Sequence, residues 1–292
     1  MDDSIKGVIL GHNQFFGISH LSSQRAAERE QKFRQPGQVV DIIRAAQEHG
    51  ASGLMLSTHE RVRAIADRIR SDSGLKDGME VHVLLPYMAK YVRAANTVGI
   101  LGMVSDIIGQ SDWSSRLRLG LTSGKALLRG DHLEKLKALI DVEMLPFKGL
   151  NVKTVFLHNA LTDLGVGLGM RDVFAFFCDY IKDRYGATPC LCTLSSSLVM
   201  RRLEAWDLCV PLMAPFNTIG YQMNPSRETC EADLAKYPCP VVAMSPLAAG
   251  AASPEVAAAY LRQMKFGSVV VGASSRAHVA HTFSLFGEAL EA

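Results

Sequence analysis

Short runs of β-branched and aliphatic residues alternate with longer amphipathic stretches along most of the chain. Each run ends in polar or small residues, and apolar positions three and four residues apart then follow. Such a run is typical of a strand buried on both faces, and the spacing is typical of a helix that covers it. The pattern predicts eight strands, over residues 7–10, 53–57, 81–85, 154–157, 189–193, 210–214, 241–244 and 269–271.

The stretches between these strands predict at least seven helices, including 39–49, 172–184, 254–264 and 276–290. Strands that alternate with helices pair in parallel through right-handed crossovers, and eight such units close into a barrel. We therefore expect an α/β fold, a (β/α)₈ TIM barrel, with residues 1–292 as a single domain. A doubly wound open sheet is the alternative, but GHNQFFG after the first strand lacks its usual GxGxxG loop.

One stretch, residues 88–149, has no convincing strand and predicts a helical insertion after the third strand. This insertion would form a lid over the catalytic face or a homo-oligomer contact, or else only pack on the barrel. Its apolar face would carry Leu133, Leu136, Leu139 and Ile140, and its basic residues are Arg116, Arg118, Lys125 and Arg129.

Composition narrows the partners and the compartment. A net charge of +2 and the lack of a recognisable motif argue against nucleic-acid binding. The acidic start of the chain does not resemble a secretory signal, and the most apolar segment, 98–108, is too short to span a bilayer. We expect a soluble, cytoplasmic protein without a membrane partner. Its six cysteines form no CxxC pair, so we expect reduced and mostly buried thiols.

Polar side chains gather where the predicted strands end. The carboxyl ends of barrel strands converge on one mouth, so these side chains should lie near one another. The candidate catalytic residues are His158, His59, Glu60, Tyr87, Lys90 and Asp163. The candidate substrate-binding residues are His12, Asn13, Asn159 and Asn217.

Two chemistries fit these groups. A histidine titrates near neutral pH and suits general acid–base catalysis, which is the role we expect for His158. Imidazole and carboxylate together also suit a divalent metal ion, with His12, His59, Glu60 and His158 as ligands. The alternative is structural: a histidine can bond to a loop, Glu60 can begin a helix, Asp163 can cap a loop and Tyr87 can pack.

The last two loops predict an anion-binding site. Small residues with free backbone N–H groups, followed by an arginine at a helix start, are suited to phosphate. The residues concerned are Ser245, Gly272, Ala273, Ser274, Ser275 and Arg276. The alternative is a serine-capped helix with a solvated arginine.

Three segments resemble the aldo-keto reductases. VVAMSPLAAG at 241–250 is similar to the seventh strand of that family, and VVVGASSRAHVAHTF at 269–283 to its cofactor-binding eighth strand and helix. VFLHNALTD at 155–163 is similar to the strand that ends in the catalytic histidine, which would be His158. The resemblance implies a barrel that binds NADP(H) and transfers hydride.

The rest of the family's catalytic set departs from the pattern. Its aspartate position falls near Ser57, no tyrosine follows in HERVRAIADRI, and its lysine position falls near Pro86 or Tyr87. Met244 stands where the family places the aromatic that stacks on nicotinamide.

Three functions follow from this mixture of retained and lost residues. The first is a non-redox lyase, isomerase or hydrolase that acts on a small anionic, including phosphorylated, metabolite through histidine-based or metal-assisted chemistry. The alternatives are an NADP(H)-dependent reductase and a non-catalytic binding barrel.

Overall fold

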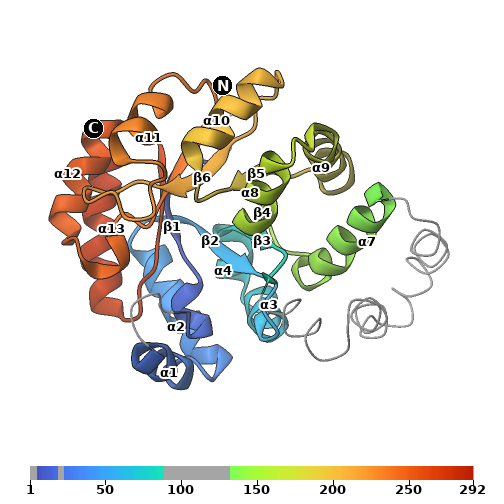
Figure 1. Cartoon of the computed structure of the whole chain (residues 1–292). Coiled ribbons are helices and arrows are strands. Elements are labelled where there is room, and N and C mark those ends of the chain that lie inside the picture. Colours follow the sequence, from blue (N-terminus) through green and yellow to red (C-terminus); the bar gives the residue numbers. More distant parts are fainter. Residues whose placement is uncertain (1–4, 19–22, 89–131, 292) are drawn as a thin grey trace.

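Eight parallel strands, hydrogen-bonded in the order of the sequence, form a closed barrel at the centre of the molecule (Figure 1). The computed structural model describes residues 5–18, 23–88 and 132–291. All eight predicted strands are confirmed, with shifts of one or two residues at their ends. They are β1 (Gly7–Leu10), β2 (Ala51–Ser57), β3 (Glu80–Leu85), β4 (Val152–Leu157), β5 (Thr188–Cys192), β6 (Leu212–Pro215), β7 (Val241–Met244) and β8 (Ser268–Val271).

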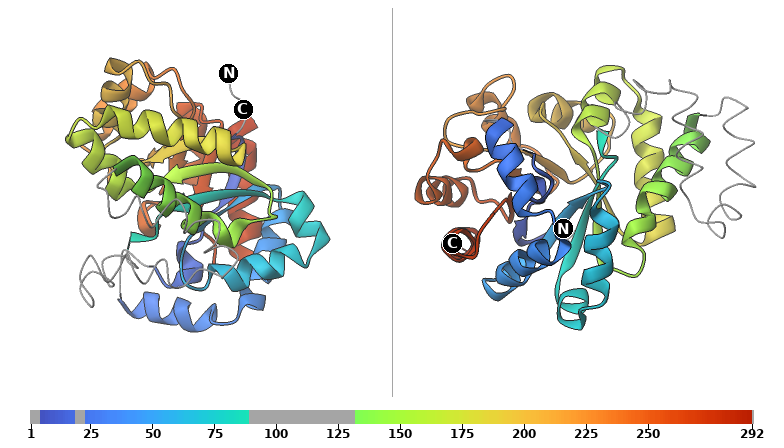
Figure 2. Two further views of the ribbon diagram at one scale, coloured as in Figure 1. Left: turned by 90° about the vertical axis from the view of Figure 1, so that its right-hand side faces the viewer. Right: turned by 90° about the horizontal axis from the view of Figure 1, so that it is seen from below.

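Helices surround this barrel, as the predicted (β/α)₈ architecture requires (Figures 1 and 2). Because the strands run in parallel, each crossover returns the chain along the outside of the sheet. The helices described are α1 (Ser23–Lys32), α2 (Pro36–Glu48), α3 (Val62–Arg70), α4 (Ser73–Gly78), α7 (His132–Met144), α8 (Asn159–Gly167), α9 (Arg171–Tyr185), α10 (Ser196–Ala205), α11 (Arg227–Leu234), α12 (Pro254–Met264) and α13 (Arg276–Glu291).

Alternation along the strands divides the core into two compartments. One lies between the strands and the helices. The other fills the barrel and includes Ile9, Met55, Phe156, Met213 and Val242. Side chains two residues apart on a strand face the same side. The interior face therefore continues from Met55 to Ser57 and from Phe156 to His158, which sets both residues toward the mouth.

The N-terminal end of the barrel interior contains a buried histidine. His82 Nδ1 lies 2.8 Å from the Thr154 hydroxyl, and its Nε2 has no hydrogen-bond partner among the described residues. Burial, and then the charge of Lys153, lower the pKa of His82 to about 4. The ring packs over Gly53 so closely that a Cβ there would lie 2.4 Å from Nε2.

Gly53→Ala should lower the free energy of unfolding by about 1–3 kcal/mol, because overpacking a buried ring forces side chains out of their preferred positions. Denaturant unfolding of both proteins measures this difference. Gly37→Ala is the matched control, since a Cβ at Gly37 meets nothing within 4 Å. An equal effect of the two substitutions would contradict this account of Gly53.

The expectation that all six cysteines are reduced is wrong for two of them. Cys209 and Cys239 form a disulfide, with their Cα atoms 5.8 Å apart. They precede β6 and β7, which are neighbours in the barrel, so topology brings together two residues 30 positions apart. The other four cysteines are buried thiols that take no part in this disulfide.

Thiol labelling of the unfolded protein checks this assignment. Without a reductant we expect four reactive thiols, and with a reductant six. Six thiols under both conditions would rule out the disulfide. Disulfides persist mainly in oxidising compartments, so the count also bears on the expected cytoplasmic location.

The predicted insertion is described only in its last part, where the chain is helical. α7 is followed by a 3₁₀ turn, η2 (Leu145–Phe147), and α7 lies beside α9 (Figure 2). Ile140 is buried on the inner face of α7, as its spacing predicts. Lys90 and the basic residues Arg116, Arg118, Lys125 and Arg129 lie outside the described residues. No described helix is long and apolar enough to cross a membrane.

Candidate active site at the barrel mouth

His158 stands at the junction of β4 and α8. Its backbone N–H donates to the Leu85 carbonyl of the neighbouring strand at 2.8 Å, which fixes the junction. As the N-cap of α8, its Nδ1 accepts the Ala160 N–H at 3.2 Å. A neutral imidazole that accepts at one nitrogen carries its proton on the other. His158 therefore presents Nε2–H, and burial lowers its pKa, which favours this neutral form.

His12, which follows β1, is the most deeply buried histidine of the mouth. Its side chain is 5% exposed, and its Nδ1 has no hydrogen-bond partner in the described chain. Burial, and then the charges of the nearby His59 and His158 imidazoles, lower its pKa to about 3. This electrostatic coupling shows that the ends of β1, β2 and β4 bring the three histidines together, as the sequence predicted.

Aromatic rings hold His59 at the rim. Its ring stacks on Phe16, with centroids 4.2 Å apart and planes 6° from parallel, and lies 4.9 Å from the Tyr87 ring. Arg61 fixes this arrangement: its backbone N–H donates to His59 Nδ1, and its guanidinium bonds to the Phe15 and Phe33 carbonyls. His59 and Tyr87 thus form an aromatic rim together with Phe16.

A buried carboxylate that the sequence analysis did not identify also lies at this end. Glu143 of α7 is 2% exposed and accepts a hydrogen bond from the Thr58 hydroxyl, which in turn accepts the Tyr87 N–H at 3.0 Å. Glu143 follows Leu136 and Ile140 at helical spacing on the inner face of α7. An acid in line with an apolar helix face is the signal that could have identified it.

Two other candidates, Asp163 and Asn217, form hydrogen bonds with neighbouring loops. Asp163 accepts bonds from the Thr193 hydroxyl and the Leu194 N–H, and burial raises its pKa. The Asn217 side chain is fully buried and bonds to the Tyr221 backbone in both directions. These contacts match the structural alternative for Asp163 and the same role for Asn217. Three further candidates lie at or beside the mouth: Glu60 and Asn13, which are exposed, and Asn159, which is half-buried.

The predicted metal site is not assembled. Among the described residues, no three His, Cys, Asp or Glu side chains are placed to hold a metal ion. Two features of the expected ligand set account for this: Glu60 is exposed, and the His59 ring lies flat against Phe16.

The contacts of the last two loops do not support the anion site predicted there. Arg276 bonds to Glu48 of α2 at 2.5 Å, and the Ser275 hydroxyl caps α13 by accepting the His278 N–H. Gln14 lies against Gly272, where a Cβ would be 2.8 Å from its Nε2. These contacts match the serine-capped helix, with the arginine paired on the outer surface.

The same contacts also leave the last two loops a poor fit for NADP(H), because groups expected to hold the cofactor phosphates have other partners. Ser245, Ala273 and Ser274 lie in the same loops, with Ala273 buried.

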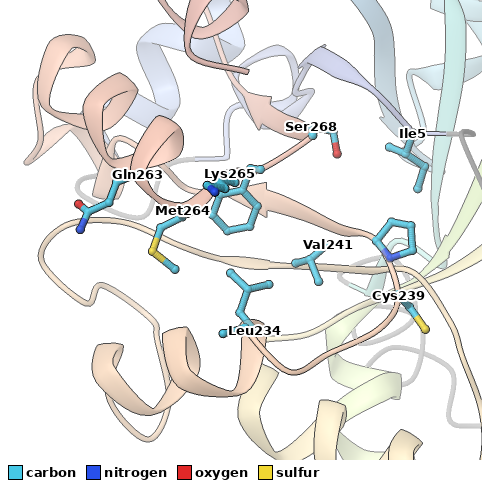
Figure 3. Close-up of a pocket in the computed structure, with 12 residues that line it drawn as sticks. Ile5, Leu234, Cys239, Val241, Gln263, Met264, Lys265 and Ser268 are labelled. Atoms are coloured by element: carbon cyan, nitrogen blue, oxygen red, sulfur yellow. The ribbon is translucent and has the colours of Figure 1, made fainter. Parts of the chain in front are cut away.

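A cavity of about 430 Å³ lies at the opposite end of the barrel (Figure 3). It opens where β7 and β8 begin, at Val241 and Ser268, and Met264 and Leu234 give it an apolar wall. Of the described residues that line it, Lys265 alone has an ionisable side chain, apart from the disulfide-bonded Cys239. Catalysis needs converging titratable groups, so we place the candidate site at the histidine-lined mouth instead.

No protein-family model and no curated protein sequence matches the chain. Among solved structures it is similar to a Pseudomonas aeruginosa protein provisionally assigned to the aldo-keto reductases, with 13% sequence identity and a TM-score of 0.62 over 99% of this chain and 93% of that chain. A second structure from that organism with the same assignment has 12% identity, a TM-score of 0.62 and the same coverage. The chain therefore has a divergent aldo-keto-reductase-like barrel fold.

Proposed function

We propose that the barrel is an enzyme that moves a proton on a small, oxygen-bearing substrate without a redox step. The observation that carries this proposal is the His158 imidazole, whose Nδ1 accepts the Ala160 N–H and whose Nε2–H is thereby left for a substrate oxygen. A neutral imidazole placed in this way polarises a carbonyl and stabilises the negative charge that develops when a neighbouring C–H loses its proton.

We assign Glu143 as the group that accepts this proton. Among the candidate carboxylates, both oxygens of Asp163 are bonded to the β5 loop and Glu60 is exposed, whereas Glu143 is buried. The Thr58 hydroxyl connects Glu143 to the segment that carries His59 and to the Tyr87 backbone. The assignment rests on this elimination and on the position of Glu143 beside the mouth.

The departures of this chain from the aldo-keto reductase catalytic set support a non-redox reaction. A reductase of this type must protonate the carbonyl oxygen while hydride adds to its carbon, and a tyrosine activated by a lysine supplies that proton. Here Ser57 ends β2 and Pro86 follows β3, so the positions from which those groups would act hold other residues. In the proposed reaction His158 binds the substrate oxygen and Glu143 accepts the proton, so neither of those groups is required.

Exchange of substrate hydrogen with solvent tests the proposal directly. The protein would be incubated in D₂O, without added cofactor, with small hydroxycarbonyl compounds and carboxylic acids. We expect deuterium to enter a position next to a carbonyl of one of them, as read by mass spectrometry. Turnover that requires added NADPH, with no exchange in its absence, would favour the reductase alternative instead.

A further inference from the structure

Three buried polar atoms in one sector of the mouth have no hydrogen-bond partner among the described residues. They are His12 Nδ1, Gln14 Oε1 and Ser57 Oγ. His12 and Gln14 follow β1, Ser57 ends β2, and Gln14 reaches Gly272 at the end of β8. These three strands are neighbours in the barrel. Buried polar atoms are nearly always paired, so unpaired ones gathered in a candidate site point to a ligand.

The hydrogen-bonding character of His12 is fixed by its surroundings. Since Nδ1 has no partner, the bond between His12 and the Met55 backbone uses Nε2. That bond partly opposes the lowering of the His12 pKa, as a bond donated by the ring does. The neutral ring therefore donates through Nε2 and leaves Nδ1 as a buried acceptor.

The other two atoms extend the same pattern. Gln14 Oε1 is a carbonyl oxygen and can only accept. The Ser57 hydroxyl can accept or donate. A ligand that satisfies this sector must therefore bring at least two hydrogen-bond donors of its own.

The nearby positive charges are bonded to other groups. The Arg61 guanidinium donates to the Phe15 and Phe33 carbonyls, and Arg276 bonds to Glu48 on the outer surface. An anionic group placed in the sector would face the lone pairs of His12 and Gln14 without a compensating cation from the described part of the chain. These contacts favour an uncharged ligand.

The rim adds an apolar surface beside these acceptors. Phe16 stacks on His59, Tyr87 lies next to His59, and Phe16 also lies 5.6 Å from the His12 ring. Aromatic walls with a few fixed polar groups are the usual composition of a small-molecule site. Here the polar groups accept, and the neighbouring rings make the surrounding wall apolar.

We propose that the substrate is an uncharged polyhydroxylated compound of the sugar or polyol class, whose hydroxyls donate to His12 Nδ1 and Gln14 Oε1 and bond to Ser57 Oγ. This inference rests on the proposed function in one respect: the same compound would offer a carbonyl or hydroxyl oxygen to His158. The proposed neutral substrate replaces the anionic metabolite that the sequence led us to expect.

Saturation-transfer difference NMR with a matched panel tests this substrate class. The panel holds neutral four- to six-carbon sugars and their alditols, the corresponding aldonates and sugar phosphates, and a protonated amino sugar. We expect saturation transfer to at least one neutral member, and none to the charged analogue of the same carbon skeleton. The inference would be overturned if no neutral member bound, whether or not the aldonates, the phosphates or the amino sugar did.

Ser57→Ala separates a ligand-binding role from a structural one. Because its hydroxyl bonds to no other described residue, the substitution should leave the unfolding midpoint in urea unchanged while weakening sugar binding about tenfold. Ser52→Ala is the matched control: Ser52 donates to the Val8 carbonyl at 3.2 Å near the other end of β2, and its loss should not change the affinity. Equal affinities of wild type and Ser57→Ala would contradict the assignment of Ser57.

Binding and proton exchange can fail independently. A neutral sugar that binds in a Ser57-dependent way, but shows no exchange, would overturn the proposed proton transfer and keep the substrate class. His158-dependent exchange on an anionic compound would overturn the substrate class and keep the proposed proton transfer.

Discussion

Replacing His158 with alanine should lower the rate of deuterium exchange by about 10²–10⁴-fold, the usual contribution of a positioned acid–base group. The physical reason is the loss of the Nε2–H donor that stabilises negative charge on the substrate oxygen. Unfolding free energies should change much less than the rate, because the ring is half-buried and its Nδ1 bonds to a helix-end N–H. Exchange rates from mass spectrometry, together with urea unfolding, measure both effects.

Two further variants make this result interpretable. Glu143→Gln keeps the shape and the Thr58 contact but removes the base, so it should also slow exchange by at least about 10²-fold. His278→Ala removes an exposed histidine on α13, outside the mouth, and should leave the rate unchanged. Full activity of the His158→Ala protein would remove the central claim of the proposed mechanism.

Acidification should destabilise the fold strongly, beginning near pH 6.5, above the range in which carboxylates titrate. His12 and His82 have pKa values of about 3 and about 4 when folded, against 6.5 in the unfolded chain. Below pH 6.5 the unfolded chain therefore binds protons that the folded protein does not. The stabilisation is complete above pH 6.5 and is lost as pH falls toward the folded values. By pH 4.5 the combined loss should be roughly 5 kcal/mol.

Urea unfolding followed by circular dichroism at a series of pH values measures this loss. His82→Asn removes one of the two groups, so its stability should fall by roughly 2–3 kcal/mol less between pH 6.5 and 4.5 than that of wild type. His278→Asn, on an exposed position, should keep the wild-type slope. If the unfolding free energy of His82→Asn fell with pH as steeply as that of wild type, His82 would not be a source of the acid destabilisation.

The order of strands was determined by the sequence, because burial on both faces leaves a local signature. A strand inside a parallel barrel is apolar at nearly every position, and this distinguishes it from the amphipathic helices around it. All eight strands could therefore be located, with β1 and β7 at their observed bounds. Short helices such as α4 and α11 were missed because six to eight residues carry little periodic signal.

The meeting of polar side chains at the candidate site also followed from the sequence, since the carboxyl ends of barrel strands meet at one mouth. This rule correctly brought His12, His59 and His158 together. It could not assign their roles, which depend on contacts between residues far apart in the chain. Asp163 and Asn217 also follow strands, but their polar atoms are bonded to neighbouring loops.

What only the tertiary structure decided was the partner of each polar group. The sequence could not show that Arg276 pairs with Glu48, that Cys209 reaches Cys239, or that Glu143 is buried beside Thr58. Hydrophobic burial is non-directional and is repeated along a whole element, so it can be read locally. Hydrogen bonds and ion pairs are directional and join single atoms, so the folded chain alone determines them.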